Sequence, residues 1–388
     1  MTKRKSSAGI PRALLIGAVL LGGPRFGEAA STKELLETIK NVDRAGQGNV
    51  AAAKALGELT QQDADVLPEI LKAFEGASPL AINWLRGGFE TIADRHIKEK
   101  KPLPAQELTA FIENTQNDRN ARRLAFEWLR EVEPETAERL IPGFLQDPSG
   151  ELRREAVARL LDQAKKIDAE KTPQLAVAVY QKALSGAVDD DQVKQIVEPL
   201  KKLKVEVDLQ KHFGFLTNWH LIGPFENRGG VGFDAVYPPE KEIDLSATYD
   251  TKFDDGFEGG KVRWQAFETD DKYGVVNIQT DVKNYKGSSM YAVTTFQSGK
   301  DQKVELRLGT PNAWKLWVNG KLVFAREEYH RGAKLDQYRV SANFKAGENT
   351  ILFKICQNEQ TDDWAQRYQF QIRVSDPAGS AILPVVAK

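Results

Sequence analysis

The chain has 388 residues, and its 54 basic and 55 acidic side chains leave a formal net charge of −1. This length suggests two domains or one elongated array. Hydrophobic residues make up 41% of the chain and charged residues 28%, which indicates a folded protein and excludes a disordered or collagen-like one. The near-zero charge argues against a nucleic-acid partner, because such a binding protein carries a basic excess. A single cysteine, Cys356, excludes an internal disulfide and multi-cysteine metal sites.

The first 29 residues have the pattern of a secretory signal peptide. Basic residues up to Arg12 precede an apolar stretch, Ala13–Gly23, and the small residues Gly27 and Ala29 then suit a cleavage site. A membrane anchor is disfavoured, because this short stretch cannot cross about 30 Å of hydrocarbon as a helix. We therefore expect export to the periplasm or the extracellular space, with no stable membrane insertion after cleavage.

Residues 30–208 are predicted to be helical, because apolar residues recur there at intervals of three and four. Breaker and capping clusters such as Gly76–Pro79, Pro102–Pro104 and Asp147–Ser149 separate the periodic segments. Helix length and spacing together predict about ten helices of roughly ten to twenty residues. Trp84 and Trp128 fall at corresponding helix positions and are expected in the core rather than on a ligand platform.

A degenerate repeat is visible within this helical part. The segment Leu140–Leu161 combines a short helix, an Asp-Pro turn and a second helix, and residues 120–129 repeat the second helix. Three positions correspond across the two segments: Arg122 with Arg153, Ala125 with Ala156, and Leu129 with Leu160. The Asp-Pro turn followed by Leu-Arg-Arg-x-Ala resembles HEAT-type repeats, which implies stacked helix pairs with an extended contact surface. A tetratricopeptide-like ending and an irregular helical bundle remain alternatives.

Residues 209–388 are predicted to form an antiparallel β-sandwich. Lys303–Leu308, Asn349–Ile355 and Tyr368–Val374 alternate polar and apolar residues, as half-buried strands do. About ten such strands and no helix are expected. The Asn319-Gly320 dipeptide predicts a type I′ hairpin turn, and Lys345–Glu348 predicts a second turn. The predicted fold is therefore multidomain, with a helical-repeat domain followed by a β-sandwich of jelly-roll type.

The hairpin also predicts which loops are neighbours. If every connection reverses the strand direction, loops 281–287, 309–312, 326–335 and 358–366 lie together at the end opposite Asn319-Gly320. These loops combine planar rings with polar groups, which suits sugar binding. The candidate ligand-binding residues are Tyr285, Asn312, Arg326, His330, Arg331, Asn358 and Trp364. Polar loops are also the ordinary composition of a sandwich rim, so a solvated surface is the alternative.

Several strand and turn segments resemble galactose-binding-like jelly-roll modules of exported bacterial proteins. The resemblance rests on Trp219–Phe225, Trp314–Val323, Gly347–Ile355 and Phe370–Val374. It implies binding of a carbohydrate or another surface ligand without catalysis. Together with the helical part, the chain resembles exported multidomain proteins of planctomycete-type bacteria.

No catalytic signature is present. The four histidines lack metal-ligand spacing, and no nucleophile elbow, phosphate loop or dinucleotide fingerprint occurs. The pairs Asp254-Asp255, Asp270-Asp271 and Asp362-Asp363 are expected to be solvated turns, with a structural Ca²⁺ as the alternative. Cys356 is expected to be a small buried residue. No cofactor is predicted.

Three functional hypotheses follow. The first is an exported non-catalytic protein whose helical scaffold presents a sandwich that binds a glycan or a partner protein. The second is a polysaccharide hydrolase that uses loop carboxylates, which would need two facing carboxyl groups about 5–10 Å apart. The third is a structural assembly subunit without a small ligand, which would show an exposed apolar patch on the repeat face. Oligomeric state is left open.

Overall fold

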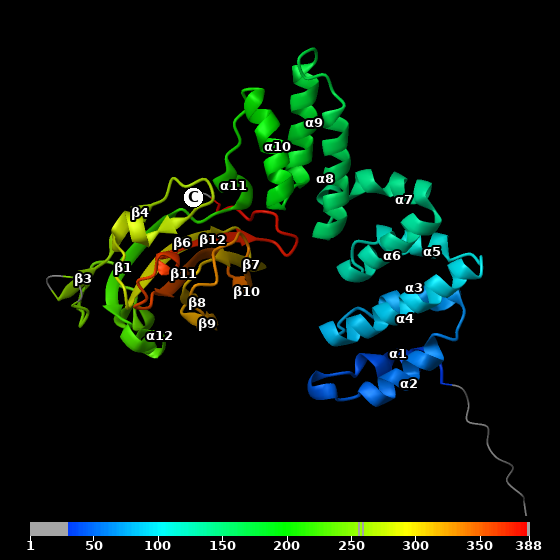
Figure 1. Ribbon diagram of the computed structural model, residues 1–388, viewed down its shortest axis with the longest axis horizontal. Helices are drawn as coiled ribbons and strands as arrows, with labels where there is room; N and C mark the ends of the chain where they lie inside the picture. Colours follow the sequence, from blue (N-terminus) through cyan, green and yellow to red (C-terminus); the bar gives the residue numbers. More distant parts are fainter. Residues whose placement is uncertain (1–29, 255–256, 258–259, 386–388) are drawn as a thin grey trace, which may run out of the picture. The chain divides into compact units, whose positions relative to one another are not determined.

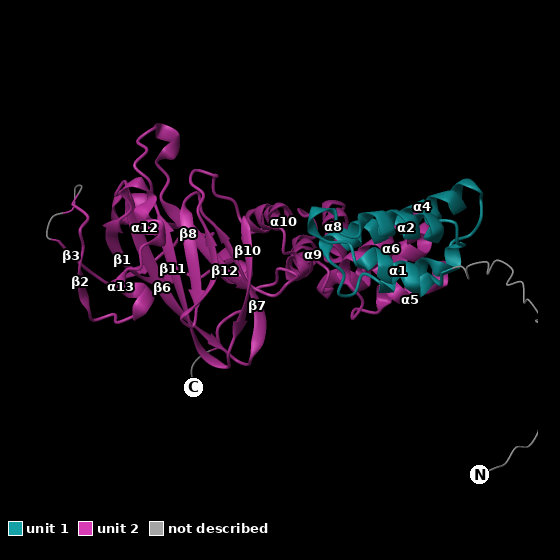
Figure 2. Cartoon of the chain, turned by 90° about the horizontal axis from the view of Figure 1, so that it is seen from below, with its two compact units in different colours: residues 1–103 teal, residues 104–388 magenta. Residues whose placement is uncertain are grey.

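The computed structural model describes residues 30–254, 257 and 260–385. The predicted signal peptide, residues 1–29, lies outside the described residues. Packing groups the chain into two compact units, residues 1–103 and 104–388 (Figure 2). Helices occupy the described chain up to residue 213 and antiparallel strands lie between residues 218 and 375 (Figure 1), which confirms the predicted fold class. In the part of the chain that the structure describes, no helix is long and apolar enough to span a membrane.

The described part of the first unit is helical. Its α-helices are α1 (Thr32–Lys40), α2 (Asn49–Leu59), α3 (Leu67–Lys72) and α4 (Pro79–Lys98). Ser31 and Glu34 form a capping box at α1, and Ser78 caps α4 ahead of a proline at the first helical position. Trp84 is half-buried against Val42 and neighbouring alanines, so it belongs to the packing between helices, as expected.

The second unit begins with a further series of helices. They are α5 (Ala105–Glu113), α6 (Arg119–Val132), α7 (Pro134–Leu140), α8 (Gly150–Lys165), α9 (Pro173–Gly186), α10 (Asp190–Lys202) and α11 (Leu209–Phe213). Asp118 and Ser149 cap α6 and α8 by accepting hydrogen bonds from main-chain amides of the first turn. Secondary structure changes close to the predicted position, residue 208, whereas packing keeps α5–α11 in one compact unit with the sandwich.

Two buried arginines at corresponding repeat positions meet at one turn. Arg122 on α6 donates two hydrogen bonds to the carboxylate of Asp147, at 2.8 and 2.7 Å, and a third to the carbonyl of Ile112. Arg153 on α8 donates to the main-chain carbonyl of the same Asp147, at 3.0 and 2.8 Å. Both arginines are less than 5% exposed. The Asp-Pro turn is therefore fixed from two successive helices.

The sandwich consists of two main antiparallel sheets. Its strands are β1 (Asn218–Glu226), β2 (Thr248–Asp250), β3 (Lys261–Arg263), β4 (Gln265–Glu268), β5 (Val276–Asn277), β6 (Ser288–Ser298), β7 (Gln302–Gly309), β8 (Ala313–Val318), β9 (Lys321–Arg326), β10 (Tyr338–Phe344), β11 (Gly347–Cys356) and β12 (Gln369–Ser375). One sheet has the order β4-β1-β6-β11-β8-β9 and the other β10-β7-β12-β5, while β2 and β3 form a separate ribbon. Trp219, Trp314, Phe353 and Phe370 lie in the core between the sheets.

The predicted hairpin is confirmed. Asn319 and Gly320 have φ angles of +51° and +76° between β8 and β9, as a type I′ turn requires. The second predicted turn lies between β10 and β11, where Gly347 has a φ of +91°. Because β10 pairs with β7 and β11 pairs with β6, this turn carries the chain from one sheet to the other.

The expectation of a sandwich without helices was wrong. Two single-turn helices, α12 (Val231–Asp234) and α13 (Pro238–Lys241), lie between β1 and β2. Gly230, with a φ of +78°, precedes α12, and prolines open α13. A helix of one turn is too short to show an apolar period of 3.6 residues, which explains why the sequence pattern did not reveal it.

Within the second unit, buried arginines join the helices to the four-stranded sheet. Arg373 on β12 is fully buried and donates hydrogen bonds to the carbonyls of Phe213 and Gly379 and to the carboxylate of Asp336. Burial alone would raise the pKa of Asp336, but its bonds to Arg373 and Arg307 outweigh this and hold the pKa below its usual value. The charge buried at this junction is therefore paired.

Candidate ligand-binding surfaces of the sandwich

Hydrogen bonds hold the four predicted loops together at one end of the sandwich. The amide of Asn284 donates to the carbonyl of Gln366 at 3.2 Å, and the main chains of Gly287 and Asn358 are joined at 3.0 Å. Asn312 donates to the carbonyl of Arg367 at 3.2 Å, which adds the loop before β8, and the hydrogen bond between His330 of loop 326–335 and Asn358 of loop 358–366 adds the fourth. The loop grouping deduced from strand parity therefore agrees with the structure.

Trp364 is the most exposed aromatic ring at this end. It lies in a short 3₁₀ turn, Asp363–Ala365, with 63% of its surface exposed. The ring of His330 meets it edge-on, with centroids 5.0 Å apart and planes at 84°. A ring nitrogen of His330 lies 2.9 Å from the side-chain oxygen of Asn358. Three predicted residues, His330, Asn358 and Trp364, thus form one contiguous cluster.

Arg326 and Arg331 are brought together by Glu328, which the sequence did not single out. Its carboxylate lies 3.1 Å from the guanidinium of Arg326 and 3.5 Å from that of Arg331. Both arginine side chains stay about half exposed or more, and each guanidinium has five N–H donors, more than one carboxylate can accept. Tyr329, between them in sequence, accepts a hydrogen bond from Asn227, and burial raises its pKa to about 12. Tyr329 therefore stays a neutral phenol at physiological pH.

Tyr285 and Asn312 occupy different environments from this cluster. Tyr285 packs edge-on against Phe253 and Phe257, with centroids 5.6 and 5.9 Å apart, and burial raises its pKa. Asn312 is 1% exposed, and its amide is bonded to Gln357, to the carbonyl of Arg367 and to the main-chain N–H of Gln369. Asn312 therefore stabilises the loop end and presents no free polar atom to a ligand.

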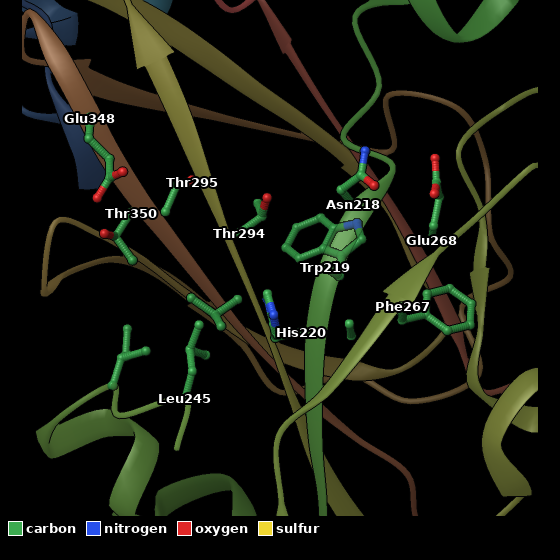
Figure 3. Close-up of a pocket in the computed structure, with 13 residues that line it drawn as sticks. Asn218, Trp219, His220, Leu245, Phe267, Glu268, Thr294, Thr295, Glu348 and Thr350 are labelled. Carbon is green, nitrogen blue, oxygen red and sulfur yellow. The ribbon is translucent and has the colours of Figure 1, made fainter. Parts of the chain in front are cut away.

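A second concave surface lies on the outer face of the six-stranded sheet, the face turned away from the sandwich core (Figure 3). The cavity has a volume of about 700 Å³. Side chains from β1, β4, β6 and β11 line it, together with Ile243 and Leu245 from the segment between α13 and β2. We refer to it below as the outer-face groove.

Strand register explains the composition of the outer-face groove. One row crosses the sheet from β4 to β9, and its neighbours are paired directly: Ala266, His220, Val293, Leu352, Trp317 and Leu322. In the adjacent row, Glu268 faces Asn218 and Thr295 faces Thr350. The sequence pattern does not reveal this surface, because it shows which residues alternate along each strand but not the order of the strands in the sheet.

A buried cation fixes the segment Phe233–Glu240 beside the groove. Lys354 is fully buried, and its ammonium donates to the carbonyls of Phe233 and Ala235 and to the carboxylate of Glu240, at 3.2, 2.7 and 2.8 Å. Burial lowers the pKa of Lys354. Tyr291 also donates to Glu240, and burial raises its pKa. The network attaches α12 and α13 to the outer face of the sheet. The segment that follows α13 supplies Ile243 and Leu245 to the lining of the groove.

Cys356 is a buried thiol, as expected. It accepts a hydrogen bond from the hydroxyl of Ser289 at 3.2 Å, and burial raises its pKa to about 11. A thiol in this state is a poor nucleophile.

Within the acidic pairs, Asp271 acts as a turn residue and Asp254 is paired with an arginine. Asp271 accepts hydrogen bonds from the amides of Tyr273 and Val275, and Asp254 lies 3.1 Å from Arg228. Asp255 lies outside the described residues. Within the described ranges, no group of three or more His, Cys, Asp or Glu side chains could hold a metal ion.

No protein-family model and no curated protein sequence matches the chain. Among solved structures, a β-glucosidase from Kluyveromyces marxianus in complex with glucose matches 28% of this chain and 14% of its own, with 12% identity and a TM-score of 0.22. A family 35 carbohydrate-binding module from an environmental isolate matches 28% of this chain and 77% of its own, with 18% identity and a TM-score of 0.19. An alkylpurine DNA glycosylase from Pseudomonas fluorescens matches 92% of this chain and 97% of its own, with 11% identity and a TM-score of 0.19. At such scores these likenesses do not bear on function.

Proposed function

We propose that this chain is an exported, non-catalytic carbohydrate-binding protein, and that its sandwich holds a glycan at the loop end around Trp364. The observation that carries the proposal is the 63% exposure of the Trp364 ring, which is held against His330. An exposed indole that a neighbouring ring holds in place offers a large, rigid apolar plane to a ligand.

The groups around the ring suit the chemistry of a sugar. The indole face can contact the C–H face of a pyranose, while hydroxyls need donors and acceptors in fixed positions. Asn358 is held by His330 at 2.9 Å, and Arg331 follows His330 directly in the chain with its side chain 64% exposed. Arg326 adds a second partly exposed guanidinium through Glu328. The surface therefore offers one apolar plane and several oriented polar groups.

Binding of the full chain to a panel of polysaccharides tests the proposal. Trp364→Ala should weaken binding about tenfold or more, because an aromatic anchor at a binding site contributes more than 1.4 kcal/mol. Trp364→Phe should keep part of the affinity, because it retains a ring. Leu175→Ala is the matched control, since Leu175 is 54% exposed on α9, far along the chain from the loops. Equal binding by Trp364→Ala and the parent protein, or no binding to any glycan, would refute the proposal.

Export is tested separately from binding. Expression of the full chain, followed by fractionation and N-terminal sequencing, should give a mature protein that begins at Ala30. Retention of residues 1–29 in a protein that stays inside the cell would contradict export and leave the binding test unaffected.

A further inference from the structure

The outer-face groove is acidic. Among the described residues that line it, Glu268 and Glu348 carry negative charge, His220 is the one further ionisable side chain, and none is lysine or arginine. Glu348 accepts a hydrogen bond from Gln297 at 3.3 Å, and neither carboxylate is in an ion pair with a described residue. A cleft lined by one sign of charge concentrates ligands of the opposite sign. The groove therefore favours a ligand that carries positive charge.

The two carboxylates mark the two sides of the groove (Figure 3). Glu268 lies on β4 and Glu348 on β11, with β1 and β6 between them in the sheet. Three strand spacings of about 4.8 Å, together with the two-residue offset of Glu348 along β11 from the row of Glu268, place their main chains roughly 16 Å apart. The spacing suits two separate anchors for one elongated ligand.

Between these anchors the groove is both polar and apolar. Asn218, Thr295 and Thr350 offer hydrogen-bonding groups along the row that contains Glu268. Leu245, which is 47% exposed, and the half-buried Ile243 form an apolar wall. A chain of pyranose rings presents hydroxyls on its edges and C–H groups on its faces, and so matches a groove with both kinds of surface. A volume of about 700 Å³ is within the range of ligand sites.

We infer that the outer-face groove binds a linear oligosaccharide of amine-bearing sugars, such as glucosamine units, with protonated amines at Glu268 and Glu348. This inference rests on the proposed function in taking the ligand to be a glycan, but it assigns a site distinct from the loop end. Charge complementarity selects the amine over its N-acetylated form, and it excludes sugars that carry carboxylates.

Titration calorimetry of the full chain with glucosamine oligosaccharides tests the inference, at about pH 6 so that the amines are protonated. The same oligosaccharides in N-acetylated form and oligosaccharides of uronic acids serve as comparison ligands. The parent protein should bind the free-amine form at least about tenfold more tightly than the acetylated form, and added salt should weaken the binding. No binding of the free-amine form would overturn the inference.

Substitutions locate the site. The double variant Glu268→Gln with Glu348→Gln should lose about tenfold or more in affinity for the free-amine form. The control Glu198→Gln with Glu206→Gln removes two exposed carboxylates outside the groove, and should bind like the parent protein.

If Trp364→Ala removes binding of the amine-bearing sugar and the groove variant does not, the groove inference fails while the proposed function stands. If spermidine binds as tightly as the oligosaccharide, the ligand class is wrong. If the groove variant loses binding while no glycan depends on Trp364, the inference holds and the loop-end site fails.

Discussion

Breaking the ion pair between Arg122 and Asp147 should strongly destabilise the second unit. The guanidinium and the carboxylate are 1% and 3% exposed in their side chains, and two hydrogen bonds of 2.8 and 2.7 Å join them. In Asp147→Ala the buried guanidinium keeps only its bond to the carbonyl of Ile112. An uncompensated buried charge costs about 3–5 kcal/mol, so we expect the free energy of unfolding to fall by that amount.

A double-mutant cycle measures the coupling between the two side chains. Arg122→Met should also cost about 3–5 kcal/mol, because it leaves the carboxylate of Asp147 buried with the main-chain N–H of Ser149 as its remaining donor. Arg122→Met combined with Asp147→Ala removes both charges, so its cost should be about 2 kcal/mol or more below the sum of the two single costs.

Urea denaturation followed by far-ultraviolet circular dichroism gives these free energies. Lys165→Ala is the control, because its ion pair with Asp162 is exposed and should contribute less than about 1 kcal/mol. Single variants within about 1 kcal/mol of the parent protein, or costs that add in the double variant, would refute the reasoning that this pair is buried and coupled.

Three further predictions concern stability. Burial lowers the pKa of His212, whose ring nitrogen bonds the carbonyl of Ala187, so below about pH 6.5 the unfolded chain takes up a proton before the folded protein does. The free energy of unfolding should therefore fall from pH 7.5 to pH 5, and less steeply in His212→Gln; equal slopes in denaturation curves would contradict this. Asn349→Ala should cost about 2–3 kcal/mol in urea denaturation, because the buried amide of Asn349 bonds both main-chain groups of Lys345; a loss below about 0.5 kcal/mol would count against it. Gly320→Ala should cost about 1 kcal/mol through its φ of +76°, with no steric contribution since nothing lies near the added methyl; an unchanged midpoint would contradict the turn assignment.

Local signals in the sequence predicted the elements that depend on neighbours in the chain. Asn319-Gly320 predicted a hairpin turn that the structure confirms. Because each connection was taken to reverse the strand direction, the position of this turn also predicted which loops meet at the opposite end of the sandwich. The correspondence of Arg122 with Arg153 was visible as a repeat, although not that both reach Asp147. Those features follow from period and turn chemistry alone.

The parts that the sequence did not reveal depend on long-range register. The outer-face groove joins His220 on β1 with Glu348 on β11, and only the strand order places them on one surface. Burial of Asn312 was equally hidden, because a polar loop residue looks the same whether its amide faces water or three protein partners. Glu328 was overlooked because a carboxylate that joins two arginines has no sequence spacing of its own.

The buried junction at Arg373 limits how this sandwich can be transplanted. Its guanidinium needs the carbonyl of Phe213, at the end of α11, and Phe213 and Phe215 share a core with residues of α8, α9 and α10. A fragment that starts at residue 214 would expose that aromatic surface to water and leave a buried cation short of an acceptor. A domain that can be moved between proteins has a hydrophobic core made only of its own residues. Here the sandwich shares a core with α8–α10, so a graft onto another protein should include these helices.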